Sequence, residues 1–292
     1  MRIAVLGATG LVGAHLRRSL GGLGDVVGTY HTSVDNALEP LDVRDAAAVR
    51  DYVRRQRPDL IVAAAADPYV DRCEIEPEAT RAVNVAGLGH VVDAARDARA
   101  RVIYLSSDYV FDGNGAPYHE DDPVHPINEY GRQKVDAERL VASLDAHLIC
   151  RFSGVFGWET RRRNFVCQVV DRLRRGESFA AASDQTLCPT YAVDLADAVR
   201  DLVTRGVGGT VHVVGPDALV RADFAREVAR VFGLDASKIS AVPGATFPSK
   251  TPRPANSSLS DDRLRAVLGR SLRHSPDALA HLRDAEPAAV AS

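Results

Sequence analysis

The sequence predicts an α/β protein built on a doubly wound parallel sheet, with a smaller C-terminal lobe. Three observations predict this class. Short apolar runs alternate with amphipathic segments up to Phe152, a glycine-rich turn follows the first run, and the alternation loosens after Phe152. Continuous apolar strands that alternate with helices are typical of a parallel sheet covered on both faces.

The expected elements follow this alternation along the chain. The predicted strands are Arg2–Leu6, Val26–Tyr30, Leu60–Ala65, Arg101–Leu105, His147–Phe152 and Thr210–Val214. The predicted helices are Val12–Leu20, Ala46–Gln56, Glu78–Arg96, Tyr130–Leu144, Asn164–Arg175, Val193–Thr204 and Arg221–Phe232. A Pro-rich stretch, Val242–Leu259, either forms loops against a ligand or crosses the surface irregularly.

Length and composition exclude several classes of protein. The 292 residues are enough for a large core, and a net charge of -3 with a pI near 6.3 argues against a nucleic-acid binder. No apolar run approaches the roughly 20 residues that a membrane helix needs. The four cysteines lack metal-ligand spacing, so we expect free thiols in the cytoplasm and no metal site. The basic run Arg161–Arg163 is either a solvated loop or lies near an anionic substrate.

The turn "GATGLVG" links the first strand to the first helix. Glycine permits a tight turn and close approach of a pyrophosphate, and the helix N-terminus offers N–H groups and a positive dipole end. This context predicts a Rossmann-like NAD(P) site; the alternative is a tight turn without a ligand. We therefore expect an NAD(P)-binding domain at residues 1–155 and a mostly substrate-binding lobe at 156–292, with some elements interleaved. The expected cofactor contacts of the turn are Gly7, Thr9, Gly10, Leu11 and Val12.

The end of the second strand bears on the choice between NAD and NADP. An acidic residue there favours NAD, because it bonds the ribose hydroxyl, whereas its absence leaves room for a 2′-phosphate. This chain has His31, Thr32 and Ser33 and no carboxylate at that point. Three donors without a repelling charge favour NADP, with NADPH preferred over NADH, unless they are ordinary polar residues of a loop.

Two further segments are expected to contact the cofactor. In "LDVRD", Asp42 either bonds the adenine or caps the helix that begins around Asp45, and Val43 lies beside it. The third strand ends in small residues, so the cofactor can lie against Ala64, Ala65 and Ala66. Small residues there are equally consistent with tight packing of a helix on the sheet.

The reacting groups are expected at the carboxyl end of the fourth strand. Tyr130 and Lys134 are four residues apart and share one helix face. An ammonium beside a phenol stabilises the phenolate and lowers the pKa of the tyrosine. Ser107 could hold a carbonyl oxygen between itself and Tyr130, and Asn84 could bind a backbone carbonyl and a water that relays protons to Lys134. The alternatives are an exposed helix face and a locally bonded mid-helix asparagine.

These motifs resemble a known family. The glycine turn, the serine and the Y-x-x-x-K pair resemble the extended short-chain dehydrogenase/reductase superfamily. More narrowly, the chain resembles the dTDP-4-dehydrorhamnose reductase-like family over nearly its whole length. The motifs that carry this are "SSDYVFDG" (106–113), "YGRQK" (130–134), "NFV" (164–166), "SDQTLCPTYAVDLA" (183–196) and "PRPANSSL" (252–259).

The resemblance implies transfer of a hydride from NADPH to the C4 carbonyl of a 4-keto-6-deoxy sugar nucleotide. Tyr130 would donate the proton, Lys134 would bind the nicotinamide ribose, and Ser107 would orient the carbonyl. The implied substrate contacts are Asp108, Tyr109, Asn164 and Arg253. A cytoplasmic enzyme is expected, and a homodimer is one expected assembly.

Some residues depart from the family pattern. Ala63 stands where such reductases usually carry Asn, and Glu74 is the only acidic position that matches the metal-linked dimer of the rhamnose enzyme. The segment "YVDRCEIEPEATRAVNV" resembles the regulatory β subunit of methionine adenosyltransferase equally well. A non-catalytic nucleotide-binding subunit therefore stays open, as does an NAD-dependent sugar-nucleotide epimerase or dehydratase.

Overall fold

The computed structural model of the chain describes residues 1–249 and 251–286. Within these ranges, seven parallel strands form the main sheet in the order β11-β6-β5-β4-β1-β2-β3. The strands are β1 (Arg2–Leu6), β2 (Asp25–Tyr30), β3 (Glu39–Pro40), β4 (Leu60–Ala63), β5 (Arg101–Ser107), β6 (His147–Phe152) and β11 (Gly209–His212). The predicted fold class is confirmed.

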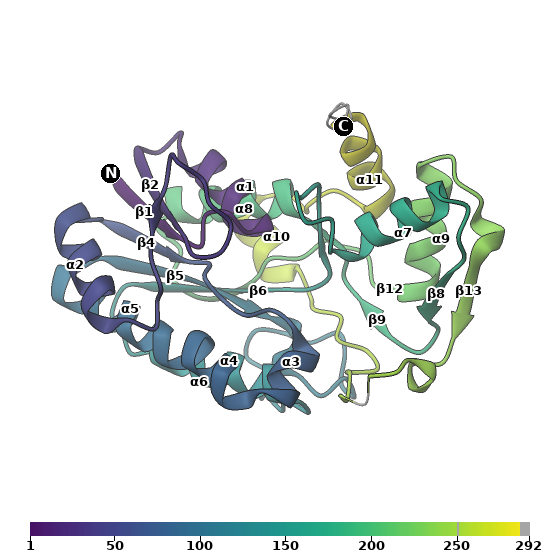
Figure 1. Cartoon of the computed structure of the whole chain (residues 1–292), viewed down its shortest axis with the longest axis horizontal. Helices are drawn as coiled ribbons and strands as arrows, with labels where there is room; N and C mark the ends of the chain where they lie inside the picture. The colour runs from purple at the N-terminus through teal and green to yellow at the C-terminus, as the bar shows by residue number, and fades with distance from the viewer. Residues whose placement is uncertain (250, 287–292) are drawn as a thin grey trace.

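Helices cover both faces of this sheet (Figure 1). Along β1, Ile3 and Val5 face one core, whereas Ala4 and Leu6 face the other, as the two-residue period of a strand requires. On the first face lie α1 (Leu11–Leu20), α8 (Ala192–Thr204) and α10 (Asp262–Leu268); on the second lie α2 (Ala46–Gln56), α5 (Leu88–Ala98) and α6 (Glu129–Ala142).

A separate core, apart from those on the two faces of the sheet, holds the lobe together at the right of Figure 1. Phe156, Val170 and Phe224 are among its buried residues. Its elements are β7 (Val155–Phe156), α7 (Phe165–Arg174), β8 (Phe179–Ala182), β9 (Thr186–Leu187), β10 (Thr190–Tyr191), β12 (Leu219–Val220), α9 (Arg221–Val231), β13 (Ile239–Val242) and α11 (Ser275–Asp284). The boundary at residue 155 stays a prediction, but α8, β11 and α10 come from the C-terminal half and pack with the main sheet.

Several expected elements differ from the structure, and three of the differences fall on segments with predicted site residues. The helix expected at Glu78–Arg96 is divided into α4 (Pro77–Arg81), one wide π-helical turn (Ala82–Gly87) and α5, after a short α3 (Val70–Ile75). The third strand ends at Ala63 rather than Ala65. The fourth strand continues to Ser107 instead of ending at Leu105, because Ser106 and Ser107 still pair with β6.

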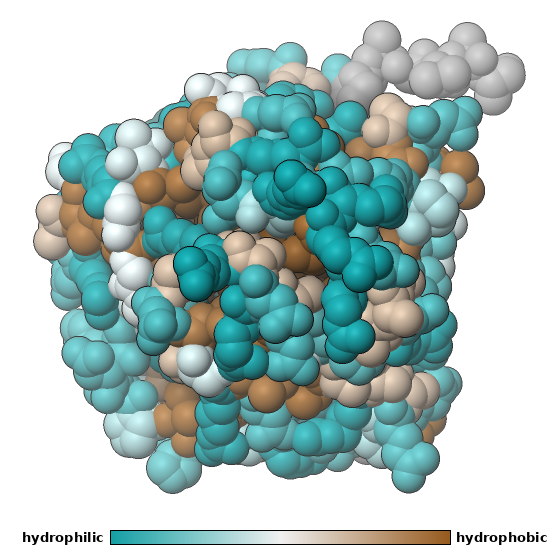
Figure 2. Space-filling view, turned by 90° about the vertical axis from the view of Figure 1, so that its left-hand side faces the viewer, coloured by the Kyte–Doolittle hydropathy of each residue, from teal (hydrophilic) through white to brown (hydrophobic). Residues whose placement is uncertain are grey.

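The surface of the described ranges is mainly polar. Figure 2, which faces the side where α2 and α5 lie, shows hydrophilic side chains with apolar ones scattered among them. Met1, Val34, Tyr69 and Ile75 are the large apolar side chains that are exposed in these ranges. No described helix has the length and apolar character required to cross a membrane.

Candidate active site

The structure brings Tyr130, Lys134 and Ser107 together beneath the surface. Asn128 caps α6 by accepting a hydrogen bond from the Gly131 N–H at 2.9 Å, which starts the helix one residue before Tyr130. Tyr130, Lys134 and Ser107 are 8%, 4% and 6% exposed, respectively. Their common burial excludes the alternative of an exposed helix face.

Lys134 links α6 to the end of β5. Its ammonium donates a hydrogen bond to the carbonyl of Leu105 at 2.9 Å, two residues before Ser107. The same ammonium lies 4.9 Å from the ring centre of Tyr104 and 5.5 Å from that of Tyr130. Burial lowers the pKa of Lys134 to about 8, partly opposed by the negative charge of Glu138.

The pKa of Tyr130 differs from the expectation. Burial raises it above its usual value, and the hydroxyl of Ser107 opposes this shift only in part. The expected lowering by Lys134 is therefore wrong for this structure, because loss of solvation outweighs the neighbouring charge. A tyrosine that keeps its proton can act as an acid but not as a standing phenolate.

Asn84 fastens the loop after β4 to α6. Its amide donates to the carbonyl of Asp67 at 3.0 Å and to Gln133 at 2.8 Å, and its oxygen accepts from the N–H of Asp67 at 2.7 Å. Asn84 lies in the π-helical turn, where the wider winding accompanies these three long-range bonds. Asn84 thus bonds a backbone carbonyl, that of Asp67, as expected. It also contacts Gln133, the residue before Lys134.

Asp108, which was expected to contact substrate, is buried and organises the site. Its carboxylate accepts hydrogen bonds from Ser107 at 2.9 Å, Ser153 at 2.7 Å and Ser257 at 2.5 Å. Burial raises its pKa, and the three hydroxyls counteract that shift. These bonds join β5, the end of β6 and the "PRPANSSL" segment at one carboxylate.

The other expected substrate residues are Tyr109, Arg253 and Asn164, of which Tyr109 contacts Tyr130. Tyr109 meets the ring of Tyr130 edge-on, with centroids 5.9 Å apart. Arg253 donates to Asp71 at 2.7 Å, while its second terminal nitrogen is buried and has no partner among the described residues. Asn164 caps α7 and donates to the carbonyl of Gly157 at 2.8 Å, so its side chain holds the turn before that helix.

The glycine turn has the shape that a phosphate requires. Gly7 has a φ of +85°, and a Cβ there would lie 2.7 Å from the nitrogen of Ala65. At Gly13, α1 lies so close to the turn that a Cβ added there would be 2.3 Å from the carbonyl oxygen of Gly7. No side chain caps α1 at Gly10, and its first turn carries no acid. Its N–H groups are therefore oriented for an anion; Thr9, Leu11 and Val12 are half-buried around them.

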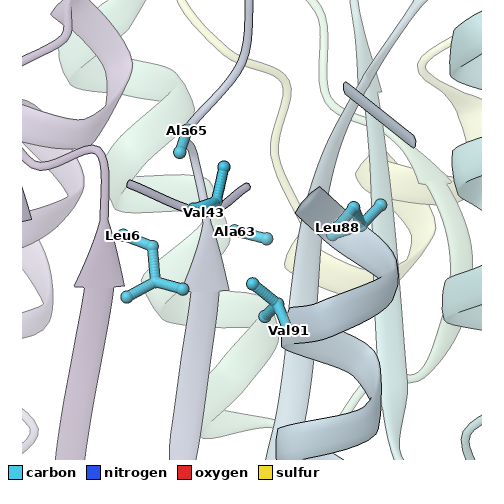
Figure 3. Close-up of a pocket in the computed structure, with 6 residues that line it drawn as sticks. All are labelled: Leu6, Val43, Ala63, Ala65, Leu88 and Val91. Atoms are coloured by element: carbon cyan, nitrogen blue, oxygen red, sulfur yellow. The ribbon is translucent and has the colours of Figure 1, made fainter. Parts of the chain in front are cut away.

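A small apolar pocket lies at the carboxyl edge of β1 and β4. Figure 3 shows the aliphatic side chains that surround it: Leu6, Val43, Ala63, Ala65, Leu88 and Val91. Val43 and Ala65 were expected to contact cofactor, and Ala64 and Ala66 flank Ala65. The free space among these side chains is about 10 Å³, room for about one water molecule, so they form an apolar wall at this edge of the sheet.

Asp42 borders this region but does not cap α2. The capping residue is Asp45, whose carboxylate accepts from the N–H groups of Ala47 and Ala48 at 2.9 and 3.0 Å. Asp42 instead pairs with Arg44, which lowers the pKa of Asp42 to about 2, and lies 3.5 Å from His31. The capping alternative is wrong, and contact of Asp42 with the adenine stays a prediction.

The described residues contain no group of three His, Cys, Asp or Glu side chains placed to hold a metal ion. Glu74, the residue matched to the metal-linked dimer, accepts a hydrogen bond from the N–H of Glu129 at 2.9 Å. Its carboxylate thus stabilises the start of α6 within the chain.

Sequence reasoning missed several residues near the reacting groups. The positive charge of Arg221 opposes the burial effects on the pKa values of Asp108 and Tyr109, so it lies near both. Ser153 and Ser257 bind Asp108, but serine is common in loops and nothing in the spacing marks these two. Arg221 begins α9, where a basic residue in the first turn is unfavourable to the helix dipole and could have drawn attention.

Comparison with protein families gives a match to the RmlD substrate binding domain over residues 1–286. The chain belongs to the RmlD family. A dTDP-4-dehydrorhamnose reductase of Escherichia coli K12 is 35% identical over 277 residues, 91% of each chain. A dTDP-4-keto-6-deoxy-D-glucose reductase of Streptomyces niveus is 33% identical over 281 residues, 95% of each chain.

A solved structure of a dTDP-4-dehydrorhamnose reductase of Bacillus anthracis, in complex with NADP, has a TM-score of 0.88 and 27% identity. The match covers 96% of this chain and 98% of that one. The predicted membership of the dTDP-4-dehydrorhamnose reductase-like family is confirmed. The predicted class of enzyme, an NAD(P)-dependent oxidoreductase, is confirmed as well, because the RmlD relatives are named as reductases.

Proposed function

We propose that this RmlD protein is an NADPH-dependent reductase of a 4-keto-6-deoxy sugar nucleotide. The observation that carries the proposal is the convergence of Tyr130, Lys134 and Ser107 at the carboxyl end of β5, where parallel sheets bind ligands. The names of its relatives support a deoxysugar substrate.

The site residues divide the chemistry among them. When bound, the reduced nicotinamide supplies the hydride for the C4 carbonyl. Tyr130, which its raised pKa keeps protonated, donates a proton to the carbonyl oxygen, and Ser107 orients that oxygen by hydrogen bonding. Lys134 holds the nicotinamide ribose, and its charge favours the transient phenolate of Tyr130.

The shape of the cofactor site supports a dinucleotide. Gly7, Gly10 and Gly13 leave the start of α1 open to a pyrophosphate, and the aliphatic side chains around Val43 line the adjoining edge of the sheet. At the end of β2, the absence of a carboxylate from residues 31–33 favours NADPH over NADH.

Tyr109, Arg253 and Asn164 form the substrate side of the proposal. Arg253 has a buried nitrogen without a described partner, so it can bond an anionic group such as the diphosphate of a sugar nucleotide. Asp108 acts by holding Ser107 in place. A cytoplasmic location and a homodimer stay predictions.

The direct test is oxidation of NADPH, followed by absorbance, on addition of dTDP-4-keto-6-deoxyglucose. Tyr130→Phe should lower turnover by about 10²-fold or more, because it removes the proton donor. Binding of NADPH to that variant, measured separately by fluorescence, should stay within about twofold, since the hydroxyl is one contact among many. Unchanged turnover in Tyr130→Phe would remove Tyr130 from the mechanism.

The same assay separates the alternatives. Tightly held NAD in the purified protein, without consumption of NADPH, would indicate an epimerase or dehydratase. Binding of NADPH without turnover, together with a stoichiometric enzyme partner, would indicate a regulatory subunit.

A further inference from the structure

We propose that Arg161, which comes from the lobe, recognises the 2′-phosphate of NADP together with Thr32 and Ser33 of the nucleotide-binding half. This inference rests on the proposed NADPH-dependent function and names the residue that provides the cofactor preference. The turn after β2 contains His31 but no arginine or lysine, and Arg161 brings a permanent cation to it from elsewhere in the fold.

The guanidinium of Arg161 lies at the end of β2. The guanidinium of Arg161 donates hydrogen bonds to the hydroxyls of Thr32 at 3.0 Å and Ser33 at 2.7 Å, across 129 and 128 residues of sequence. Thr32 and Ser33 follow β2 after His31, at the end of the strand where this kind of sheet binds the adenosine ribose. Two hydroxyls and a guanidinium therefore converge at the place where a 2′-phosphate would lie.

The neighbouring charges leave Arg161 as the group suited to this role. In the same segment, Arg162 donates to the carboxylate of Asp171 at 2.7 Å, and Arg163 donates to the hydroxyl of Tyr69 at 2.6 Å. Arg161 has no carboxylate partner among the described residues. Its charge is thus free to meet an anion, and its planar fork suits the oxygens of a phosphate.

Two carboxylates near the end of β2 are paired with arginines. Asp35 pairs with Arg17 at 3.3 Å, and Asp42 pairs with Arg44 through bonds that include one of 2.9 Å. A phosphate monoester carries about −1.5 to −2 charges at pH 7, so unpaired acids here would repel it. Because both acids have arginine partners, Arg161 tips the local charge towards binding an anion.

The segment that carries Arg161 is held in position before any ligand arrives. The carboxylate of Glu159 accepts hydrogen bonds from the N–H groups of Arg163 at 2.9 Å and Asn164 at 2.6 Å. These bonds close the turn between β7 and α7 around Arg161. Because the backbone around Arg161 is already ordered, binding of an anion by this arginine costs less conformational entropy.

The test is calorimetric titration of the full chain with NADP⁺, NAD⁺ and 2′,5′-ADP. Arg161→Ala should weaken binding of NADP⁺ and of 2′,5′-ADP about 10- to 100-fold, the range for a hydrogen-bonded charge, and should change binding of NAD⁺ less than about twofold. Arg161→Lys keeps the charge but not the planar fork, so its affinity for NADP⁺ should lie between that of wild type and that of Arg161→Ala. Arg163→Ala is the matched control, since it lies in the same turn but contacts Tyr69; its ratio of NADP⁺ to NAD⁺ affinity should equal that of wild type.

Three results would contradict the inference. Unchanged affinity of Arg161→Ala for NADP⁺, in a wild-type protein that prefers NADP⁺, would overturn the role of Arg161 and leave the proposed function intact. An equal loss for NADP⁺ and NAD⁺ would show a structural role instead. A wild-type protein that binds neither dinucleotide would overturn the proposed function, and this result is visible before any variant is compared.

Discussion

Lys134→Met provides a quantitative test of the electrostatics of the site. Burial lowers the pKa of Lys134 from 10.5 to about 8, and each pKa unit corresponds to about 1.4 kcal/mol, so the charged form costs about 3 kcal/mol in the folded state. Methionine has a similar length and no charge. Loss of the hydrogen bond to Leu105 offsets part of the gain, and we expect the variant to be about 1–2 kcal/mol more stable than wild type at pH 7.

The dependence on pH has a definite sign. Between pH 8 and 10.5 the unfolded wild type binds more protons than the folded state, because the folded pKa of Lys134 is the lower one. The free energy of unfolding of the wild type therefore rises with pH over this window. The stability of Lys134→Met relative to wild type should fall by about 2.5 kcal/mol between pH 7 and pH 10, so the wild type should be the more stable protein at pH 10.

Urea unfolding of both proteins at several pH values between 7 and 10 measures this difference directly. Lys238→Met is the matched control, because Lys238 also donates to a backbone carbonyl but at the surface, where the burial on which the argument depends is absent. A stability difference for Lys134→Met that stayed constant across the window would refute the reasoning. Turnover should be lost in Lys134→Met at every pH.

Two further predictions concern the frame around the site. Glu138→Ala should lower the free energy of unfolding by about 3–5 kcal/mol, because it leaves the buried Arg151 without the carboxylate that accepts its hydrogen bonds at 2.8 and 2.9 Å. The double variant, Glu138→Leu with Arg151→Met, should recover most of this loss in urea titrations. Failure to recover it would contradict the ion-pair explanation. Gly13→Ala should destabilise the fold by about 1–3 kcal/mol, because the added Cβ would lie 2.3 Å from a carbonyl oxygen. It should also weaken the binding of NADP⁺ about tenfold in calorimetry. Gly22→Ala, whose nearest neighbour would lie at 3.8 Å, should leave NADP⁺ affinity unchanged, and an equal effect of both would count against the close-approach argument.

The differences from the predicted elements have physical causes that pattern reading does not capture. The expected helix at Glu78–Arg96 is interrupted by a π-helical turn in which Asn84 bonds Asp67 and Gln133, 17 and 49 residues away. Helical periodicity reports which face is apolar, not whether a long-range bond widens one turn. The two-residue strands of the lobe were missed because so short a run carries no detectable period.

The reacting groups were predictable because their signals are local. Tyr130 and Lys134 share a helix face at a spacing of four, and Ser107 ends a strand, so a strand–helix reading places them close together. The opposite shift of the pKa of Tyr130 was not predictable, because it depends on how deeply the neighbouring elements bury the phenol.

The sequence by itself determined the alternation of strands and helices, the glycine turn and the placement of Tyr130 and Lys134 on one helix face, since each depends on residues within a few positions of one another. Only the tertiary structure decided how distant segments meet. It joined three serines at Asp108 and placed Arg161 against Thr32 and Ser33. Contacts across more than 100 residues follow from the way whole elements pack, and that packing leaves no local pattern in the chain.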